Sequence, residues 1–225
     1  MTRQMLSTVS HDLKTPLATI IGSLEVYTRM ADKLPEDKKR MLIQSAMGEA
    51  YRLDQFITNI LDMAKLENGM VTIRNERCDV TSLLQDCVTR LGPRASKGTI
   101  QLKPIGTMPL IIQTDVMMLG RAVNILLDNA LKHAGVQPHI VITYSADEQG
   151  CHITVTDNGP GIDHGKEEEI FSKYTRFSKG DQRNAGTGLG LAICRQIMRL
   201  LGGTVRASAI DGGGVAFRLD FPSMS

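Results

Sequence analysis

His139-Ile-Val-Ile-Thr-Tyr-Ser145 and His152-Ile-Thr-Val-Thr156 are two runs in which apolar and polar residues alternate. Alternation with a period of two is typical of strands that bury one face, and the connecting turn at residues 146–150 is short. The two runs therefore predict an antiparallel hairpin. The second run leads directly into Asp157-Asn-Gly-Pro-Gly161, so a glycine-rich turn begins where the strand ends.

Further short strands and helices surround this hairpin in the sequence. Strand-like runs occur at residues 70–74, 99–102, 110–113, 204–209 and 215–221. Asp79 and Asp115 are suitable N-cap residues for helices that run to about Leu91 and His133. A third helix is predicted from about Leu189 to Leu201. Helices mixed with hairpins indicate an α+β sandwich, in which helices cover one face of a mostly antiparallel sheet.

The first 68 residues have a different, helical periodicity. Apolar residues recur at steps of three and four in two stretches: Leu6, Val9, Leu13, Leu17, Ile20, Leu24 and Tyr27, then Leu42, Ala46, Ala50, Leu53, Ile57, Ile60 and Ala64. A turn at 31–38 separates the two stretches, and Asn68-Gly69 is a good helix end. The pattern predicts an all-α helical hairpin whose apolar face needs a second copy to cover it.

This interpretation divides the chain into two domains. Residues 1–68 would form a homodimer as a four-helix bundle, because two hairpins can bury the faces that one leaves exposed. Residues 78–225 would form the α+β sandwich, and residues 68–78 would serve as a hinge between the two.

Composition excludes several classes of function. Lys and Arg total 26 against 24 Asp and Glu, which gives a formal net charge of +2. That balance argues against a chain built mainly to bind nucleic acid or an anionic membrane. Aromatic residues make up only 4% of the chain and Trp is absent, so base-stacking platforms are not expected either.

Cysteine usage and hydropathy point to a cytoplasmic chain. The four cysteines form no Cys-x-x-Cys pair and have no histidine at zinc-finger spacing, so we expect reduced thiols: Cys78, Cys87, Cys151 and Cys194. No run of about 18 apolar residues occurs, so nothing in the chain is expected to cross a membrane. We expect the soluble part of a longer protein, with any membrane connection made through a segment absent from this chain.

Two glycine-rich pieces are candidates for phosphate binding. The first, Asp157-Asn-Gly-Pro-Gly161, follows a strand, and the second, Gly186-Thr-Gly-Leu-Gly190, opens a helix. Glycine lets backbone N–H groups approach a phosphate, and a helix N-terminus favours an anion. Each piece alone is more often a tight turn. The second piece is not a Walker A motif, because no Lys-Ser/Thr follows, and no βαβ unit surrounds it.

Polar residues near these pieces fit the same chemistry. Asn129 and Lys132 lie three residues apart on the predicted helix, where an amide oxygen could ligate Mg²⁺ and the lysine could meet phosphate oxygens. The alternative is the water-facing side of an ordinary amphipathic helix. The loop at 170–183 carries four basic residues against Asp181 alone, and a solvated basic loop is the simpler alternative: Lys173, Arg176, Lys179 and Arg183.

A histidine near the N-terminus is a candidate nucleophile. His11 and Thr15 are four residues apart and share a helix face, and Asp12 lies beside the histidine. A neighbouring carboxylate can fix the tautomer of an imidazole and raise its nucleophilicity. Pro16 removes one helix hydrogen bond from the same turn. A lone surface histidine usually has no function, so this one gains weight only beside a nucleotide site.

Taken together, these segments resemble the catalytic core of a sensor histidine kinase of a two-component system. The resemblance covers essentially the whole chain and consists of five boxes in the expected order: Ser10–Leu17, Asn124–His133, Asp157–Gly161, Ile170–Phe177 and Gly186–Leu191. It implies an all-α hairpin followed by an α+β sandwich of the Bergerat (GHKL) type. The stretches 59–69 and 186–196 are most similar to the branch that senses potassium and turgor.

The resemblance also implies roles for matching positions. His11 would be the phosphoacceptor, Asp12 its orienting or base partner, and Thr15 would position water when a phosphorylated response regulator is dephosphorylated. Asn129 would hold Mg²⁺, and Asp157 would accept the adenine amino group of ATP. Residues 163–186 would form the ATP lid, in which Arg176 would reach the γ-phosphate. The other nucleotide-binding positions would be Lys132, His133, Gly159, Gly161, Lys173, Gly186, Thr187, Gly188, Leu189 and Gly190.

The function implied is an ATP-dependent autokinase that passes its phosphoryl group from His11 to an aspartate on a response regulator receiver domain. Relatives commonly carry an asparagine four residues before the Mg²⁺-binding one, whereas this chain has Ile125 there and Asn124 one step earlier. A rotation of about 100° turns Asn124 away, so we expect no ligand role for it. Ile125 also replaces the catalytic glutamate of ATP-hydrolysing enzymes of this fold. A GHKL-type ATPase and a nucleotide-binding scaffold are the alternatives.

Overall fold

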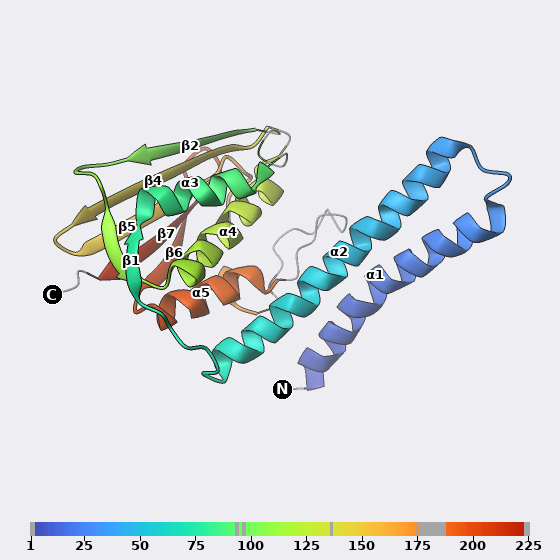
Figure 1. Cartoon of the computed structure of the whole chain (residues 1–225), viewed down its shortest axis with the longest axis horizontal. Helices are drawn as coiled ribbons and strands as arrows, with labels where there is room; N and C mark the ends of the chain where they lie inside the picture. The colour runs from blue at the N-terminus through green and yellow to red at the C-terminus, as the bar shows by residue number, and fades with distance from the viewer. Residues whose placement is uncertain are drawn as a thin grey trace. The chain divides into compact units, whose positions relative to one another are not determined.

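A computed structural model of the chain describes residues 3–92, 95, 98–135, 137–173, 175 and 188–222, apart from the side chains of residues 3–8 and 11. The chain divides into two compact units, Met1–Asp62 and Met63–Ser225. Figure 1 shows the helical hairpin of the first unit and the sheet with its covering helices in the second. None of the helices in the described ranges is both long enough and apolar enough to span a membrane.

The first unit consists of two helices, as predicted, and the last turn of the second helix belongs to the second unit. Helix α1 spans Arg3–Met30 and helix α2 spans Glu36–Glu67, so the turn between them is short and includes Pro35. Pro16, Ala46 and Phe56 are buried in this unit. The single hairpin leaves other large apolar side chains in contact with water, including Leu17, Ile21 and Leu24 on α1.

The second unit is built on a five-stranded sheet with strand order β2-β4-β5-β7-β6. Its strands are β2 (Thr99–Pro104), β4 (His139–Asp147), β5 (Gly150–Thr156), β6 (Thr204–Ala209) and β7 (Val215–Pro222). The β2–β4 pair is parallel and the other three pairs are antiparallel. A separate antiparallel pair joins β1 (Glu76–Asp79) to β3 (Ile111–Thr114).

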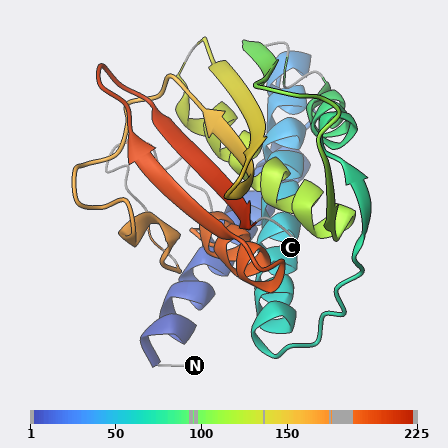
Figure 2. The ribbon, with the colours of Figure 1, turned by 90° about the vertical axis from the view of Figure 1, so that its left-hand side faces the viewer.

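Three helices cover one face of this sheet: α3 (Val80–Arg90), α4 (Val116–His133) and α5 (Gly190–Leu200). Figure 2 shows them together on the side of the sheet away from the viewer. The sheet face beneath them is apolar and includes Ile142, Ile153 and Leu219, which are completely buried. In the register Ile142 lies opposite Val155, so the predicted alternation does place the apolar residues on one face. The predicted α+β sandwich is confirmed.

Local capping explains where two of the helices begin. The Asp79 carboxylate accepts a hydrogen bond from the Thr81 N–H at 3.0 Å, and the Asp115 carboxylate accepts one from Met118 at 3.0 Å. Both aspartates therefore satisfy N–H groups that have no partner within the helix, as the sequence predicted.

One predicted strand is wrong. Residues 70–74 form no strand, and the first strand of the second unit begins at Glu76. The Arg74 N–H donates to the Asp115 carboxylate at 2.9 Å instead of to a neighbouring strand. The alternation in 70–74 therefore has no strand to pair with, because β3 pairs with the residues that follow.

The four cysteines are free and buried in the second unit. Burial raises the pKa of Cys78 and Cys87 to about 11 and that of Cys151 and Cys194 to about 12. A thiol that stays protonated at neutral pH is a poor nucleophile and a poor metal ligand. These residues pack the core and supply no chemistry.

Candidate functional site

The glycine-rich turn that follows β5 is fixed to the sheet by its first residue. Asp157 is only 4% exposed, and its backbone N–H donates to the carbonyl oxygen of Val215 in β7 at 3.0 Å. One carboxylate oxygen, Oδ1, accepts the Gly159 N–H at 2.8 Å. The backbone of Val215 is a second hydrogen-bond partner of the carboxyl group. A carboxylate has several acceptor positions and can accept a further hydrogen bond from a ligand.

The environment of Asp157 disfavours its charge. Burial raises the pKa of this carboxyl, and hydrogen bonds from the backbone of Gly159 and Val215 and the nearby His133 only partly offset the effect. Charged groups are rarely left buried without full compensation unless they serve a purpose. The position and pKa of Asp157 therefore mark the turn as a binding site for a group that donates hydrogen bonds.

The next residue, Asn158, ties the turn to the connection between α4 and β4. Its side-chain oxygen accepts the His139 N–H at 2.8 Å, and its side-chain N–H₂ donates to the Gln137 carbonyl at 3.1 Å. Residue type and spacing alone predict no role for Asn158. Its partners lie about twenty residues away in the chain, and no local pattern could reveal them.

Glycines allow three segments to approach closely at this turn. A Cβ atom on Gly159 would lie 2.7 Å from the His133 carbonyl oxygen, and one on Gly214 would lie 2.2 Å from the Asp157 carbonyl oxygen. Gly161 and Gly214 both have positive φ angles, of 84° and 102°, which glycine adopts without strain. The turn after β5 therefore packs directly on the end of α4 and on the β6–β7 turn.

The expected Mg²⁺ and phosphate residues lie at the end of α4. Asn129 is half-buried, whereas Lys132 and His133 are exposed in the last turn of the helix. The pKa of His133 is lowered, chiefly by desolvation where its ring meets the surrounding chain and then by the charge of Lys132. A neutral imidazole at neutral pH is thus favoured at this position.

The start of α5 lies against the same helix. A Cβ atom on Gly190 would lie 3.4 Å from Cγ2 of Ile125. Asn129 is four residues after Ile125 and therefore shares its helix face, on the side of α4 that meets α5. Leu189, the N-cap residue of α5, is buried and offers no side-chain hydrogen bond to the first turn. The N–H groups of that turn are suited to an anion.

Several predicted residues cannot be placed at this site. Arg176, Gly186 and Thr187 lie outside the described residues, while Gly188 has a positive φ of 64° directly before α5. Lys173 forms an ion pair with Glu67, the last residue of α2, and both residues belong to the second unit. The Lys173 ammonium group is therefore engaged with a carboxylate in this structure.

The candidate nucleophile lies in the first unit. His11 is part of helix α1, although its side chain lies outside the described part of the structure. Pro16 is inside the same helix and has no N–H to donate to the carbonyl group of Asp12, four residues earlier. Thr15 is exposed, and its carbonyl oxygen accepts a hydrogen bond from the Thr19 hydroxyl at 3.2 Å.

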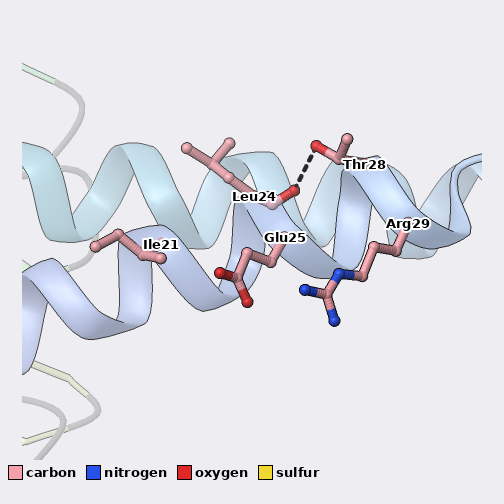
Figure 3. Close-up of a pocket in the computed structure, with 5 residues that line it drawn as sticks. All are labelled: Ile21, Leu24, Glu25, Thr28 and Arg29. Carbon is pink, nitrogen blue, oxygen red and sulfur yellow. Dashed lines mark hydrogen bonds between the residues drawn. The ribbon is translucent and has the colours of Figure 1, made fainter.

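A shallow recess of about 330 Å³ lies further along α1. It is lined by Ile21, Leu24, Glu25, Thr28 and Arg29 (Figure 3). The Thr28 hydroxyl donates to the Leu24 carbonyl at 2.8 Å, which leaves the recess floor largely apolar. The recess forms part of the exposed apolar face of the hairpin and contains no residue suited to catalysis.

The arrangement in the second unit fits a purine nucleotide. Asp157 offers a buried acceptor, the glycines let the backbone of three segments meet beside it, and the N-cap residue Leu189 makes no side-chain hydrogen bond to the first turn of α5. Asn129 offers an oxygen ligand of the kind that Mg²⁺ binds. No group of three or more metal-ligating side chains occurs among the described residues. A divalent ion would therefore need the phosphate oxygens of the nucleotide as further ligands.

Two protein families match the chain. Residues 1–69 match the His Kinase A (phospho-acceptor) domain, and residues 114–225 match the family described as histidine kinase-, DNA gyrase B-, and HSP90-like ATPase. The two matches correspond to the helical hairpin and to most of the sandwich.

Individual proteins resemble the whole chain. The sensor protein KdpD of Escherichia coli is 33% identical over 224 residues, which are 98% of this chain and 24% of KdpD. The solved histidine kinase AdeS of Acinetobacter baumannii has a TM-score of 0.76 at 21% identity and covers 96% of this chain and 98% of AdeS. Histidine kinase ThkA, solved in complex with the response regulator TrrA, has a TM-score of 0.79 at 22% identity and covers 99% of this chain and 62% of ThkA. The chain thus spans about a quarter of KdpD.

Proposed function

This chain belongs to the sensor histidine kinases of two-component systems, and from that premise we propose that it transfers the γ-phosphoryl group of ATP to His11. The phosphoryl group would then pass to an aspartate of a response regulator receiver domain. The observation that carries the proposal is the buried Asp157 carboxylate, held in a glycine turn between the end of α4 and the β6–β7 turn.

Asp157 would select the base of the nucleotide. Its carboxylate would accept the adenine amino group, while Oδ1 stays hydrogen-bonded to Gly159. A carboxylate fixed by the backbone needs no reorganisation when the ligand binds, which favours specificity over a flexible side chain. The burial that raises the pKa of Asp157 would also keep water away from the hydrogen bond to the adenine amino group.

The phosphates would extend from this turn toward the start of α5. Lys132 and His133 lie at the end of α4, and the N–H groups of the first turn of α5 can meet the phosphate oxygens. Gly186, Thr187 and Arg176 are proposed to contact the triphosphate on the basis of the family resemblance alone. Lys173 would have to exchange Glu67 for a phosphate to do the same.

Phosphoryl transfer requires mainly positioning and neutralisation of charge. A ring nitrogen of His11 would form the bond to the γ-phosphorus while the bond from phosphorus to the bridging oxygen breaks, and ADP would leave with that electron pair. Asp12 would orient the imidazole and take its proton. Asn129 would hold Mg²⁺, which supplies positive charge to the phosphate oxygens when bound.

We propose a homodimer formed through residues 1–68 as the working assembly. Leu17, Ile21 and Leu24 follow one another at helical spacing on α1 and are exposed in the single hairpin. A second hairpin packed on this face would form a four-helix bundle. A response regulator is the second partner that we propose, in keeping with the ThkA–TrrA complex. Assignment to the potassium- and turgor-sensing branch remains a prediction.

Labelling with ATP tests the proposed transfer. The protein is incubated with Mg²⁺ and γ-labelled ATP, and we expect label on the protein that acid removes and base does not. His11→Gln should abolish the label without affecting nucleotide binding. Label that persists in this variant would contradict the assignment of His11, and steady release of phosphate without labelled protein would favour the ATPase alternative.

Asn129→Ala tests the metal assignment in the same assay. We expect loss of labelling with an unchanged dimer, because Asn129 is half-buried and lies in the second unit. Asn124→Ala is the matched control on the same helix and should keep most of the labelling, since its face points away from Asn129. Equal loss in both variants would show that the effect is structural.

A further inference from the structure

Arg195, on the second turn of α5, makes several contacts with the described N-terminal part of the expected ATP lid. Its Nη2 donates to the Phe171 carbonyl oxygen at 3.0 Å, and its Nη1 lies 3.4 Å from Glu168 Oε2. The guanidinium carbon also lies 5.6 Å from the centroid of the Phe171 ring, within the range of a cation–π interaction. A single side chain thus contacts this segment in three ways.

The segment that Arg195 holds is a short 3₁₀ helix, η2 (Glu169–Phe171). The Phe171 ring is buried and packs edge-on against the Phe217 ring of β7, with centroids 6.4 Å apart and an interplanar angle of 89°. The Phe171 carbonyl lies at the C-terminal end of η2, where carbonyl groups lack partners within the helix. Arg195 satisfies that carbonyl while the ring is anchored in the core.

The three contacts differ in strength. The Glu168 side chain is 84% exposed, and ion pairs of this kind contribute little in water. The Arg195 side chain is only 28% exposed, so its bond to the Phe171 carbonyl and its position over the Phe171 ring lie in a drier environment. The carbonyl bond and the ring contact therefore account for most of the interaction.

The contact joins two parts of the chain on either side of the nucleotide site. Phe171 comes two residues before Lys173, and Arg195 comes five residues after Gly190. By holding η2 on α5, Arg195 fixes the position of the chain at residue 171 relative to the N-terminus of α5. The η2 segment and the start of α5, which would both adjoin the proposed phosphate site, then stay fixed relative to each other.

We propose that Arg195 is a positioning residue of the nucleotide site, an inference that rests on the proposed function. It touches neither substrate nor metal and acts through Phe171 and η2. Without it, the 3₁₀ helix loses its carbonyl partner and its cation–π contact, and ATP must order the segment when it binds. The binding of ATP should therefore weaken more than the transfer step.

The test compares Arg195→Ala and Arg195→Lys with wild type, using the full chain. We expect Arg195→Ala to raise the KM for ATP about tenfold, the effect of losing one hydrogen bond to a charged group. The kcat for labelling should change by less than about threefold. Arg195→Lys keeps the charge without the planar fork, so it should restore part of the loss. Hydrogen exchange at the amides of Phe171 and Ser172 should rise in Arg195→Ala.

A control variant separates positioning from general destabilisation. Arg199→Ala removes an exposed arginine one turn further along α5. It should leave the KM and the amide exchange unchanged. A lower kcat with unchanged KM in Arg195→Ala, or an equal effect of Arg199→Ala, would overturn the proposal in favour of a purely structural role.

The experiment also separates this inference from the proposed function. If wild-type protein takes no label, the kinase assignment fails, and the Kd of a fluorescent ATP analogue replaces the KM. A Kd about tenfold weaker, with faster amide exchange at Phe171, would still support the positioning role. An unchanged Kd and unchanged exchange would reject that role whatever the wild-type activity.

Discussion

At Asp157 the requirements of ligand binding conflict with those of protein stability. Burial raises its pKa, so the folded protein holds the charged form less readily than the unfolded chain does. A raised pKa of this kind leaves stability intact below the unfolded value of 3.8 and lowers it as the pH rises through the folded value. At neutral pH the carboxylate therefore destabilises the fold that presents it.

Asp157→Asn should separate the two requirements. The amide oxygen can still accept the Gly159 N–H, while the buried charge is removed, so we expect Tm at pH 7 to rise by about 1–4 °C. The gain should shrink as the pH is lowered and vanish below 3.8, where the wild-type carboxyl becomes neutral in both states. ATP affinity should fall at least about tenfold, because an acceptor for the adenine amino group is weakened. Scanning calorimetry measures Tm, and nucleotide titration measures ATP affinity. A variant with a lower Tm than wild type would contradict the prediction that the buried charge destabilises the fold.

His152 illustrates a charged cluster that stabilises the sheet. Its Nδ1 lies 2.6 Å from Asp220 Oδ1, and its Nε2 lies 3.0 Å from Asp147 Oδ1. Arg218 Nε also donates to Asp220 Oδ1 at 2.6 Å. The cluster thus links the β4–β5 turn, β5 and β7 at the end of the sheet opposite Asp157.

The pKa of Asp220 reports the strength of this cluster. Burial alone would raise that pKa, but hydrogen bonds from Arg218 and His152 outweigh burial and lower it. The stabilisation is therefore present above the unfolded value of 3.8 and is lost as the pH falls through the lower folded value. We expect Asp220→Asn to lose about 1–2 kcal/mol in the free energy of unfolding at pH 7.

Urea unfolding at a series of pH values measures this loss. The difference between wild type and Asp220→Asn should vanish once the pH lies below the folded pKa of Asp220. Asp211→Asn, in the exposed β6–β7 turn, serves as the control and should differ little from wild type. A difference that persists undiminished in acid would show that the substitution acts through packing.

Among the elements, the turn after β5 depends on contacts that only glycine permits. A Cβ atom on Gly159 would lie 2.7 Å from the His133 carbonyl and 2.9 Å from Asp157 Oδ1. Gly159→Ala should therefore push the turn off α4, with a loss of about 1–3 kcal/mol in stability and at least tenfold in ATP affinity. Both effects can be measured by urea unfolding and nucleotide titration.

Gly202→Ala provides the comparison for that variant. Gly202 ends α5 with a positive φ of 75° and has open space around it, so alanine there adds backbone strain without a clash. Stability should fall by a similar amount, about 1–2 kcal/mol, while ATP affinity stays the same. If both variants lost affinity equally, weakened binding would reflect global destabilisation.

The elements that the sequence predicted correctly are those fixed by local chemistry. Asp79 and Asp115 begin their helices through bonds to N–H groups two and three residues ahead, and such signals are visible in the sequence. The strand predicted at 70–74 failed for the opposite reason. Its alternation was suitable, but the Arg74 N–H bonds to Asp115, 41 residues later. Pairing over that distance is not encoded in a local pattern.

The residues of the candidate site also fall into two groups, those that the sequence could predict and those that it could not. The glycine turns, Asp157 and Asn129 could be proposed from residue type and spacing, because phosphate and Mg²⁺ chemistry restricts which residues suffice. Asn158 and Arg195 could not, since their partners come from distant segments. The close approach of Gly214, in the β6–β7 turn, to Asp157 likewise became evident only in the structure.

For the whole molecule, the distribution of apolar surface matters more than net charge. The second unit buries most of its large apolar residues, whereas the hairpin of the first unit leaves a row of them exposed on α1. Ile21 is 48% exposed and lies between Leu17 and Leu24 on the row, beside the recess shown in Figure 3. A folded protein in water rarely leaves such a face uncovered, and a second copy of the hairpin is complementary to it.

Ile21→Glu tests this interpretation at the level of the assembly. In a two-fold bundle the new carboxylate would be buried near its own copy, so we expect the dimer to weaken at least a hundredfold, or roughly 2.7 kcal/mol. Val26→Glu is the matched control, because Val26 is 42% exposed on a different face of α1 and should leave the dimer intact. Sedimentation over a range of concentrations measures both. Because the second unit has its own core, the Ile21→Glu monomer should still bind ATP; a variant that loses ATP binding together with the dimer would mean that the units do not fold independently.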